Sequence, residues 1–288
     1  MKLSVIIPFY NAAYTIAVQL EALSRQSWSE PWEVIVSDNG STDESLTIVR
    51  RYQERIQNLR IVDSSDRRGA SHARNIGVLA AISDALAFCD ADDEVGPNWV
   101  AAIGEALSVH DFVASRFDTE KLNTSQIQRY KGNPQRDGFQ MLWYPPYVPH
   151  AASTGLGVKR SVHDAVGGFD ESLLALEDTD YCCKIHLAGW RLHFESGAVI
   201  HYRNRSKFKS IYRQSRSWAE YNVLLYKRHR PTGMRIMRPW SRYLSDVRKL
   251  LQRLPRIRRV EGRAAWIWLL GQQVGRIQGS IKYRVPPV

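Results

Sequence analysis

The triplet Asp90-Ala91-Asp92 directly follows the apolar run 85–89. Two carboxylates one residue apart on an irregular turn can both reach one divalent cation, and hard oxygen ligands suit Mg²⁺ or Mn²⁺. Such ions keep some of their water and bridge to substrate phosphates. The pattern alone is weak evidence, because a solvated turn with Asp93 and Glu94 capping a helix would also explain it. Its position after an apolar run favours a metal site.

Two further segments carry groups that suit a nucleotide. Asp38 follows the apolar run 33–37 and could accept a hydrogen bond from a base or ribose. The residues after it could also form a simple turn in which Ser41, Thr42 or Asp43 caps the next helix. In RRGASHARNIG (residues 67–77), glycines, small residues and Arg74 open a predicted helix, where backbone N–H groups and a cation suit a diphosphate. Arg74 could equally pair with surrounding acids.

The elements that must position these residues alternate along the first ninety residues. Short apolar runs predict strands and amphipathic stretches predict helices, so right-handed βαβ units should form a parallel sheet covered on both faces. The predicted elements are strands at 3–7, 33–37, 59–62 and 85–89, with helices at 13–26, 45–56 and 70–81. Ligands bind such sheets outside the carboxyl ends of the strands. The polar residues after each strand should therefore face one crevice.

Four motifs, VIIPFYN, VSDNGSTD, GASHARNIG and CDADD, occur in this order. Together they resemble the inverting family 2 glycosyltransferases of GT-A fold, over about residues 1–205. The resemblance implies a Rossmann-like α/β domain that transfers a sugar from a nucleoside-diphosphate sugar to an acceptor hydroxyl, with a metal at the acidic triplet. It also implies a donor site made of Pro8 and Tyr10 around the base, Asp38 on the base, Arg74 near the ribose or diphosphate, and Asp90-Ala91-Asp92 on the phosphates.

The second half resembles the family's acceptor segment, in which VGGFDE is followed by Glu177-Asp178. The resemblance implies that Asp178 is the general base. An acceptor alcohol is a poor nucleophile until a carboxylate takes its proton, whereas a metal can neutralise the departing diphosphate. One base and one metal thus suffice for a single displacement with inversion, without a covalent intermediate. Acids at a helix N-terminus, where they complement the dipole, are the alternative interpretation of this pair.

Two further candidates for the site have weaker support in the sequence. His201 ends a strand predicted at 198–202, and the resemblance makes it a candidate metal ligand or diphosphate contact, although it could simply be a partly buried polar residue. Trp143 and Tyr144, with Tyr147 and His150, could form an acceptor platform, because sugars present C–H faces to aromatic rings. Core packing is the alternative for these aromatic residues.

Charge is unevenly distributed along the chain. The net charge is +11, but residues 201–288 hold 22 Lys and Arg against three Asp and Glu. The sequence therefore predicts a catalytic domain at 1–205, with a donor half (1–110) and an acceptor half (111–205), and a basic helical extension at 206–288. Basic helices with Trp and Leu suggest contact with an anionic membrane surface, which would suit a glycolipid or lipid-borne glycan acceptor. The apolar run 264–270 could instead pack on the catalytic domain.

Composition bears on the expected cellular compartment and on the alternative functions. Three cysteines, no apolar run of eighteen residues and no signal-peptide pattern predict a cytoplasmic protein, which could sit peripherally at the inner face of the membrane and act in cell-surface glycan synthesis. Nucleic-acid binding would explain the basic tail but not the acidic front half, so no nucleic-acid partner is expected. A sugar nucleotidyltransferase is disfavoured because no Gly-rich basic loop follows the first strand.

Overall fold

A computed structural model describes residues 2–123, 125–126, 128–142, 146–233 and 240–285, with side chains for all of these except 240–244. The chain forms two compact units. The first comprises Met1–Asp118, Asn133–Gln140 and Pro149–Tyr202, and the second comprises Thr119–Gly132, Met141–Val148 and Arg203–Val288.

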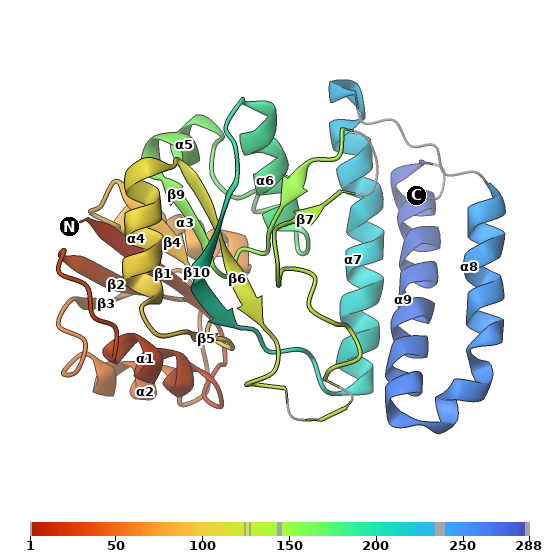
Figure 1. Cartoon of the computed structure of the whole chain (residues 1–288), viewed down its shortest axis with the longest axis horizontal. Coiled ribbons are helices and arrows are strands. Elements are labelled where there is room, and N and C mark those ends of the chain that lie inside the picture. Colours follow the sequence, from red (N-terminus) through yellow and green to blue (C-terminus); the bar gives the residue numbers. More distant parts are fainter. Residues whose placement is uncertain (1, 124, 127, 143–145, 234–239, 286–288) are drawn as a thin grey trace. The chain divides into compact units, whose positions relative to one another are not determined.

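The first unit is built on one eight-stranded sheet in the order β3-β2-β1-β4-β9-β6-β10-β5 (Figure 1). Its strands are β1 (Leu3–Phe9), β2 (Trp32–Asp38), β3 (Leu59–Asp63), β4 (Ala85–Phe88), β5 (Glu94–Val95), β6 (Phe112–Asp118), β9 (Leu156–Lys159) and β10 (His193–His201). The β3-β2-β1-β4 half is parallel, as is the β6–β10 pair. β9 runs antiparallel to β4 and β6, and β5 runs antiparallel to β10. The mainly parallel sheet predicted from the sequence is confirmed.

Helices cover both faces of this sheet. They are α1 (Ile16–Ser24), α2 (Ser45–Tyr52), α3 (Ala70–Ala80), α4 (Trp99–Val109), α5 (Arg160–Ala165) and α6 (Glu177–Leu187). Side chains of α1, α2 and α4 share one buried apolar cluster, and those of α3, α5 and α6 share another. β1 supplies both, because Val5 and Ile7 belong to the first cluster and Ile6 to the second. Successive side chains of a strand point to opposite faces of the sheet. Because both faces are covered here, this strand is an almost unbroken apolar run in the sequence.

The second unit is helical, as expected for the C-terminal region. Its helices are α7 (Phe208–His229), α8 (Trp240–Gln252) and α9 (Val260–Tyr283), with 3₁₀ turns at Arg230–Thr232 and Leu254–Arg258. α9 meets α7 through Gly271, Gly275 and Gly279, four residues apart, where an added Cβ would collide with α7. Residues four apart share a helix face, so these glycines let the two backbones approach closely.

Some elements differ from the sequence-based expectations. β10 starts at His193 rather than 198, and its register shifts between Glu195 and Val199. β6 and β9 were not predicted, because β9 has only four residues and β6 carries polar Ser115 inside a buried strand. Ser115 is accommodated there because its hydroxyl accepts from Trp99 Nε1 (2.9 Å) and donates to the Gly155 carbonyl (2.8 Å). The short strands β7 (Gln140–Met141) and β8 (Pro149–His150) lie outside this sheet.

Candidate active site

The carboxyl ends of the parallel strands bring the first group of predicted residues together. The register pairs Phe9 of β1 with Asp38 of β2, and Asp38 in turn with Asp63 of β3. Pro8 is buried inside β1, whereas Tyr10 just beyond it is 47% exposed. This edge of the sheet therefore carries an exposed aromatic ring near a half-buried carboxylate, a combination that can hold a flat polar ligand.

The loops after β1 and β2 are tied to each other. The Asn11 N–H donates to Ser41 Oγ (3.1 Å), and the Thr42 N–H donates to Asn11 Oδ1 (2.8 Å). Asp43 Oδ1 accepts from the N–H of Ser45, the first residue of α2 (3.0 Å). The N-cap position itself is Glu44, whose side chain makes no capping bond. Neither Ser41 nor Thr42 therefore caps this helix, and Asp43 bonds its first N–H from the residue before the cap. Asp38 Oδ1 accepts from the Ser41 N–H (2.9 Å), which fixes the carboxylate at the strand end.

The acidic turn after β4 gathers three carboxylates. Ligand oxygens of Asp90, Asp92 and Asp93 all lie within 4.8 Å of one another. The backbone of the turn is held by Gln19, whose Nε2 donates to the Asp90 carbonyl (3.1 Å), and by Thr154, whose Oγ1 accepts from the Asp90 N–H (3.2 Å). Three hard oxygen donors on a fixed turn fit Mg²⁺ or Mn²⁺. Sequence reasoning treated Asp93 only as a helix cap, although its place beside the triplet was the available signal.

Arg74 connects the acidic turn to the start of α6. It is 3% exposed, and its guanidinium donates to Asp90 Oδ1 (2.7 Å) and to Glu177 Oε1 (2.9 Å). Burial opposes its charge, but the two carboxylates raise the pKa of Arg74 and keep it cationic. The sequence left open whether Arg74 pairs with surrounding acids, and it does. Its place near a ribose or diphosphate stays a prediction.

Asp178 lies in the first turn of α6, beside Glu177. Leu176 enters the helix in the left-handed conformation (φ 59°), and the Thr179 N–H donates to Asp178 Oδ1 (2.7 Å). Burial raises the pKa of Asp178, while the hydrogen bond from Thr179 opposes the rise. Burial and then the Asp178 charge raise the pKa of Glu177. A carboxylate with a raised pKa is a stronger proton acceptor, which suits a general base.

His201 lies on β10, beside the short strand that follows the acidic turn, and is not among the residues whose ligand atoms cluster there. The β5–β10 ladder pairs His201 with Glu94, two residues after Asp92. His201 Nδ1 lies 2.6 Å from Asp118 Oδ2. A carboxylate on Nδ1 orients the ring and leaves Nε2 as the ligating nitrogen, the arrangement that metal-binding histidines use. Its metal-ligand role stays a prediction. Trp143 and Tyr144 lie outside the described residues.

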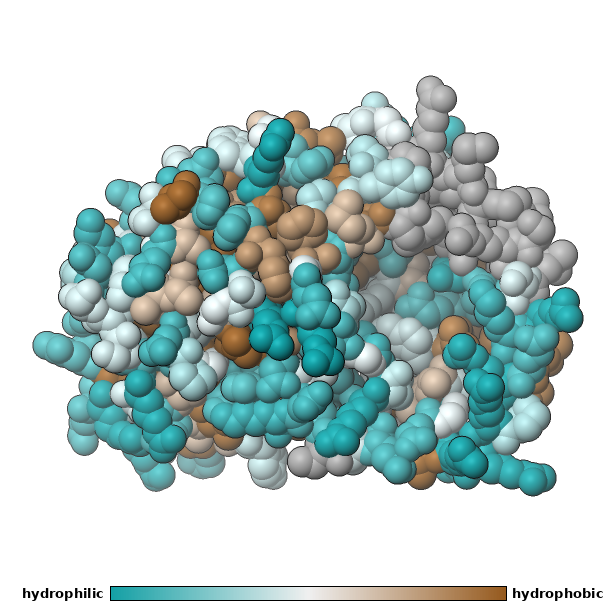
Figure 2. Space-filling model, viewed as in Figure 1, coloured by the Kyte–Doolittle hydropathy of each residue, from teal (hydrophilic) through white to brown (hydrophobic). Residues whose placement is uncertain are grey.

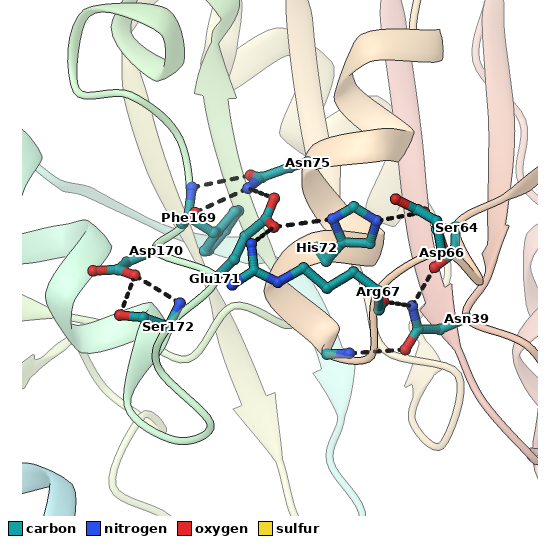
Figure 3. A network of polar contacts seen from close by, with 11 residues as sticks. Asn39, Ser64, Asp66, Arg67, His72, Asn75, Phe169, Asp170, Glu171 and Ser172 are labelled. Carbon is teal, nitrogen blue, oxygen red and sulfur yellow. Dashed lines mark hydrogen bonds and ion pairs between the residues drawn. The ribbon is translucent and has the colours of Figure 1, made fainter.

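A polar network that the sequence analysis missed fixes the loop before α3 (Figure 3). Asn39 donates to the Ser64 and Arg67 carbonyls (2.5 and 2.8 Å) and accepts from the Gly69 N–H (2.9 Å). Its side chain thus replaces the backbone contacts that the loop lacks, and so holds the N-terminus of α3 in place.

The same network reaches the segment before α6. Glu171 accepts from Arg67 (2.8 Å) and Asn75 (3.0 Å) and contacts His72 Nδ1 (3.0 Å), while His72 Nε2 contacts Asp66 (2.9 Å). Burial opposes protonation of His72, but the two carboxylates raise its pKa. These partners lie up to 104 residues apart in the chain, so no local pattern could reveal them.

Comparison with known proteins identifies the class. Residues 4–167 match the family model of Glycosyl transferase family 2, and because this is more than half of the chain, the chain belongs to that family. The mannosyltransferase PcManGT from Pyrobaculum calidifontis, solved in complex with GDP-Man and Mn²⁺, has a TM-score of 0.61 at 19% identity over 97% of this chain and 75% of that one. The first unit thus has the GT-A fold, as the resemblance implied.

Curated relatives match over shorter stretches. The uncharacterized glycosyltransferase YibD of Escherichia coli K12 is 44% identical over 96 residues, covering 33% of this chain and 27% of that protein. Glycosyltransferase AglE of Haloferax volcanii is 29% identical over 203 residues, covering 68% and 65%. The matched part of the chain thus spans between about a quarter and two-thirds of these relatives' lengths.

Proposed function

We propose that this chain is an inverting, metal-dependent glycosyltransferase that moves a sugar from a nucleoside-diphosphate sugar to the hydroxyl of a glycan, glycolipid or similar acceptor. The observation that carries the proposal is the double pairing of buried Arg74. It bonds Asp90 of the acidic turn on one side and Glu177, the neighbour of Asp178, on the other. A candidate metal site and a candidate base are thereby held by one side chain.

The reaction is a single displacement. Asp178 takes the acceptor proton as the acceptor oxygen bonds to the anomeric carbon and the bond from that carbon to the diphosphate oxygen breaks. Attack opposite the leaving group inverts the anomeric centre. Asp90, Asp92 and Asp93, with His201 as a further candidate, would hold Mg²⁺ or Mn²⁺, which when bound neutralises charge on the diphosphate. Tyr10 and Asp38 would bind the base and ribose of the donor.

A structural neighbour and the carboxylate ligands available in this chain both support the metal requirement. PcManGT, which shares the fold, was solved with GDP-Man and Mn²⁺. The three carboxylates here are oxygen ligands of the kind that those ions prefer.

Peripheral membrane contact through the second unit is part of the proposal. Ile277 and Ile281 of α9 are 39% and 75% exposed and lie one turn apart, among basic residues. None of the described helices is long and apolar enough to cross a bilayer. Hydrophilic residues cover most of the described surface on the face shown in Figure 2. We expect cosedimentation with vesicles containing anionic lipid and not with neutral vesicles, an affinity that high salt should weaken.

Product analysis tests the proposed reaction. The chain is incubated with sugar nucleotides and Mn²⁺, and the transferred or hydrolysed sugar is followed by NMR from the first turnovers. We expect the anomeric configuration opposite to that of the donor, and no product after chelation of the metal. A product that retains the donor configuration would overturn the single-displacement mechanism, and full activity in the presence of chelator would overturn the metal requirement.

A further inference from the structure

An open cleft of about 530 Å³ lies in the first unit, away from the strand ends described above. Its walls come from the end of α1, the start of β2 and the loop between α2 and β3. These are the amino ends of the strands, whereas the candidate donor site lies at their carboxyl ends. β2 has seven residues, so the two edges lie about 20 Å apart. The cleft therefore belongs to no part of the reaction site.

Two tryptophans, Trp28 and Trp32, line the cleft. Both rings are half-buried and pack on the apolar cluster shared by α1, α2 and α4. Trp28 also rests against Gly104 of α4, where any side chain would collide with the indole. Among the described residues, neither indole N–H has a hydrogen-bond partner. The rings are thus rigid, and each retains a polar group that can serve a ligand.

Planar polar side chains share the cleft with these rings. Arg55 is held by a two-point contact with Glu21 (2.6 and 3.1 Å), and Asn58 Nδ2 donates to the Trp32 carbonyl (3.0 Å). Glu30 and Gln57 are exposed and line the same cleft. The cleft therefore offers carboxylate, amide and guanidinium groups beside aromatic faces, with no excess of positive charge.

We propose that this cleft binds a saccharide, as a carbohydrate site separate from the one that handles the donor. Sugar rings present a C–H face that packs on indole and hydroxyls that both donate and accept. Carboxylate, amide and guanidinium side chains are the matching partners for those hydroxyls. The volume lies within the range of small-molecule sites. A nucleic acid would require a basic surface, and an apolar ligand would leave the polar side chains unpaired.

The test is binding of the full chain to an array of neutral oligosaccharides of one to six hexose or N-acetylhexosamine units, without nucleotide. We expect at least one glycan series to be retained, with Trp32→Ala weakening it by about tenfold. Glu30→Ala and Gln57→Ala should also weaken it, and because these side chains are exposed, they should leave the melting temperature unchanged. Trp190→Phe, which alters a half-buried tryptophan outside the cleft, is the matched control.

Two results would overturn the proposal. One is an array on which the chain retains no glycan, and the other is binding that is identical in the wild type, Glu30→Ala and Gln57→Ala. Failure here is distinguishable from failure of the proposed transferase activity, because the cleft variants should keep their metal-dependent stabilisation by a nucleoside diphosphate. Capture of a peptide in place of any sugar would also count against it.

Discussion

The carboxyl edge of the first unit and the helices of the second unit are stabilised in opposite ways. At the carboxyl edge, the buried cation of Arg74 is matched by the half-buried carboxylates of Asp90 and Glu177. Between α7 and α9 the helices meet closely at glycines, an exposed ion pair joins Lys282 to Glu220 (2.7 Å), and cations far outnumber acids in this region. Buried charges specify one arrangement of the site, whereas close helix packing leaves the surface charge available for other partners.

Asp178→Asn should have the largest effect on function. The amide keeps the size of the side chain but cannot accept the acceptor proton, so we expect turnover to fall by about 10² to 10⁴-fold. Nucleotide affinity should remain near that of the wild type, because Asp178 is assigned to the acceptor. Initial rates and calorimetric nucleotide binding measure the two effects. Near-normal turnover would show that the base lies elsewhere.

Arg74→Leu should have the largest effect on stability. It leaves the Asp90 and Glu177 carboxylates without their shared cation, and breaking a buried pair costs about 3 kcal/mol or more. Arg55→Leu is the matched control, because Arg55 pairs with Glu21 at the surface and is 51% exposed, so its loss should cost under about 1 kcal/mol. Urea unfolding measures both variants, and equal losses would refute the contrast between buried and exposed pairs.

Gly275→Ala tests the close contact in the second unit. At an exposed helix position this change stabilises by about 1 kcal/mol through helix propensity. Here the new methyl would collide with the Arg216 carbonyl of α7, so we expect a loss of about 1–3 kcal/mol in the free energy of unfolding. Helix propensity predicts a gain in the free energy of unfolding, whereas a collision with α7 predicts a loss. A variant more stable than the wild type would therefore exclude the close contact.

The smallest expected effect concerns pH and His72. Its pKa is raised in the folded chain, so its contribution to stability is fully present below about pH 6.5, the unfolded value, and is lost as pH rises through the folded value. The pKa values of Glu171 and Asp66 are lowered, so their contribution is lost as pH falls. His72→Gln should flatten the decline in urea midpoint between pH 6 and 8. An unchanged slope would exclude the network as its cause.

The sequence predicted the parallel half of the fold because local patterns determine it. The runs that became β1, β2 and β4 are mostly apolar and buried on both faces, and each is followed by polar residues that the register places at one edge. Strand β9 could not be predicted, because its four residues are specified by their antiparallel neighbours β4 and β6 rather than by their own pattern.

Some residues of the candidate site could likewise be predicted from the sequence, and others could not. The acidic triplet could be picked out from residue type and spacing, whereas Asp178 was identified only through the resemblance to the family. The structure connects their two segments through Arg74, which bonds Asp90 and Glu177. The roles of Glu171, His72 and Asn39 could not, since each depends on partners brought near by the fold. Long-range side-chain contacts leave no local signal that a sequence pattern can report.

Thermal unfolding with nucleoside diphosphates and their sugars, each with and without Mn²⁺, tests the central claim most directly. A ligand at a hundred times its Kd adds about 2.7 kcal/mol to the free energy of unfolding. The account predicts that at least one nucleotide stabilises the wild type only in the presence of Mn²⁺, and that Asp92→Asn loses this effect. Absence of stabilisation by every nucleotide, or an effect that Asp92→Asn retains in full, would contradict a metal-dependent donor site at this turn.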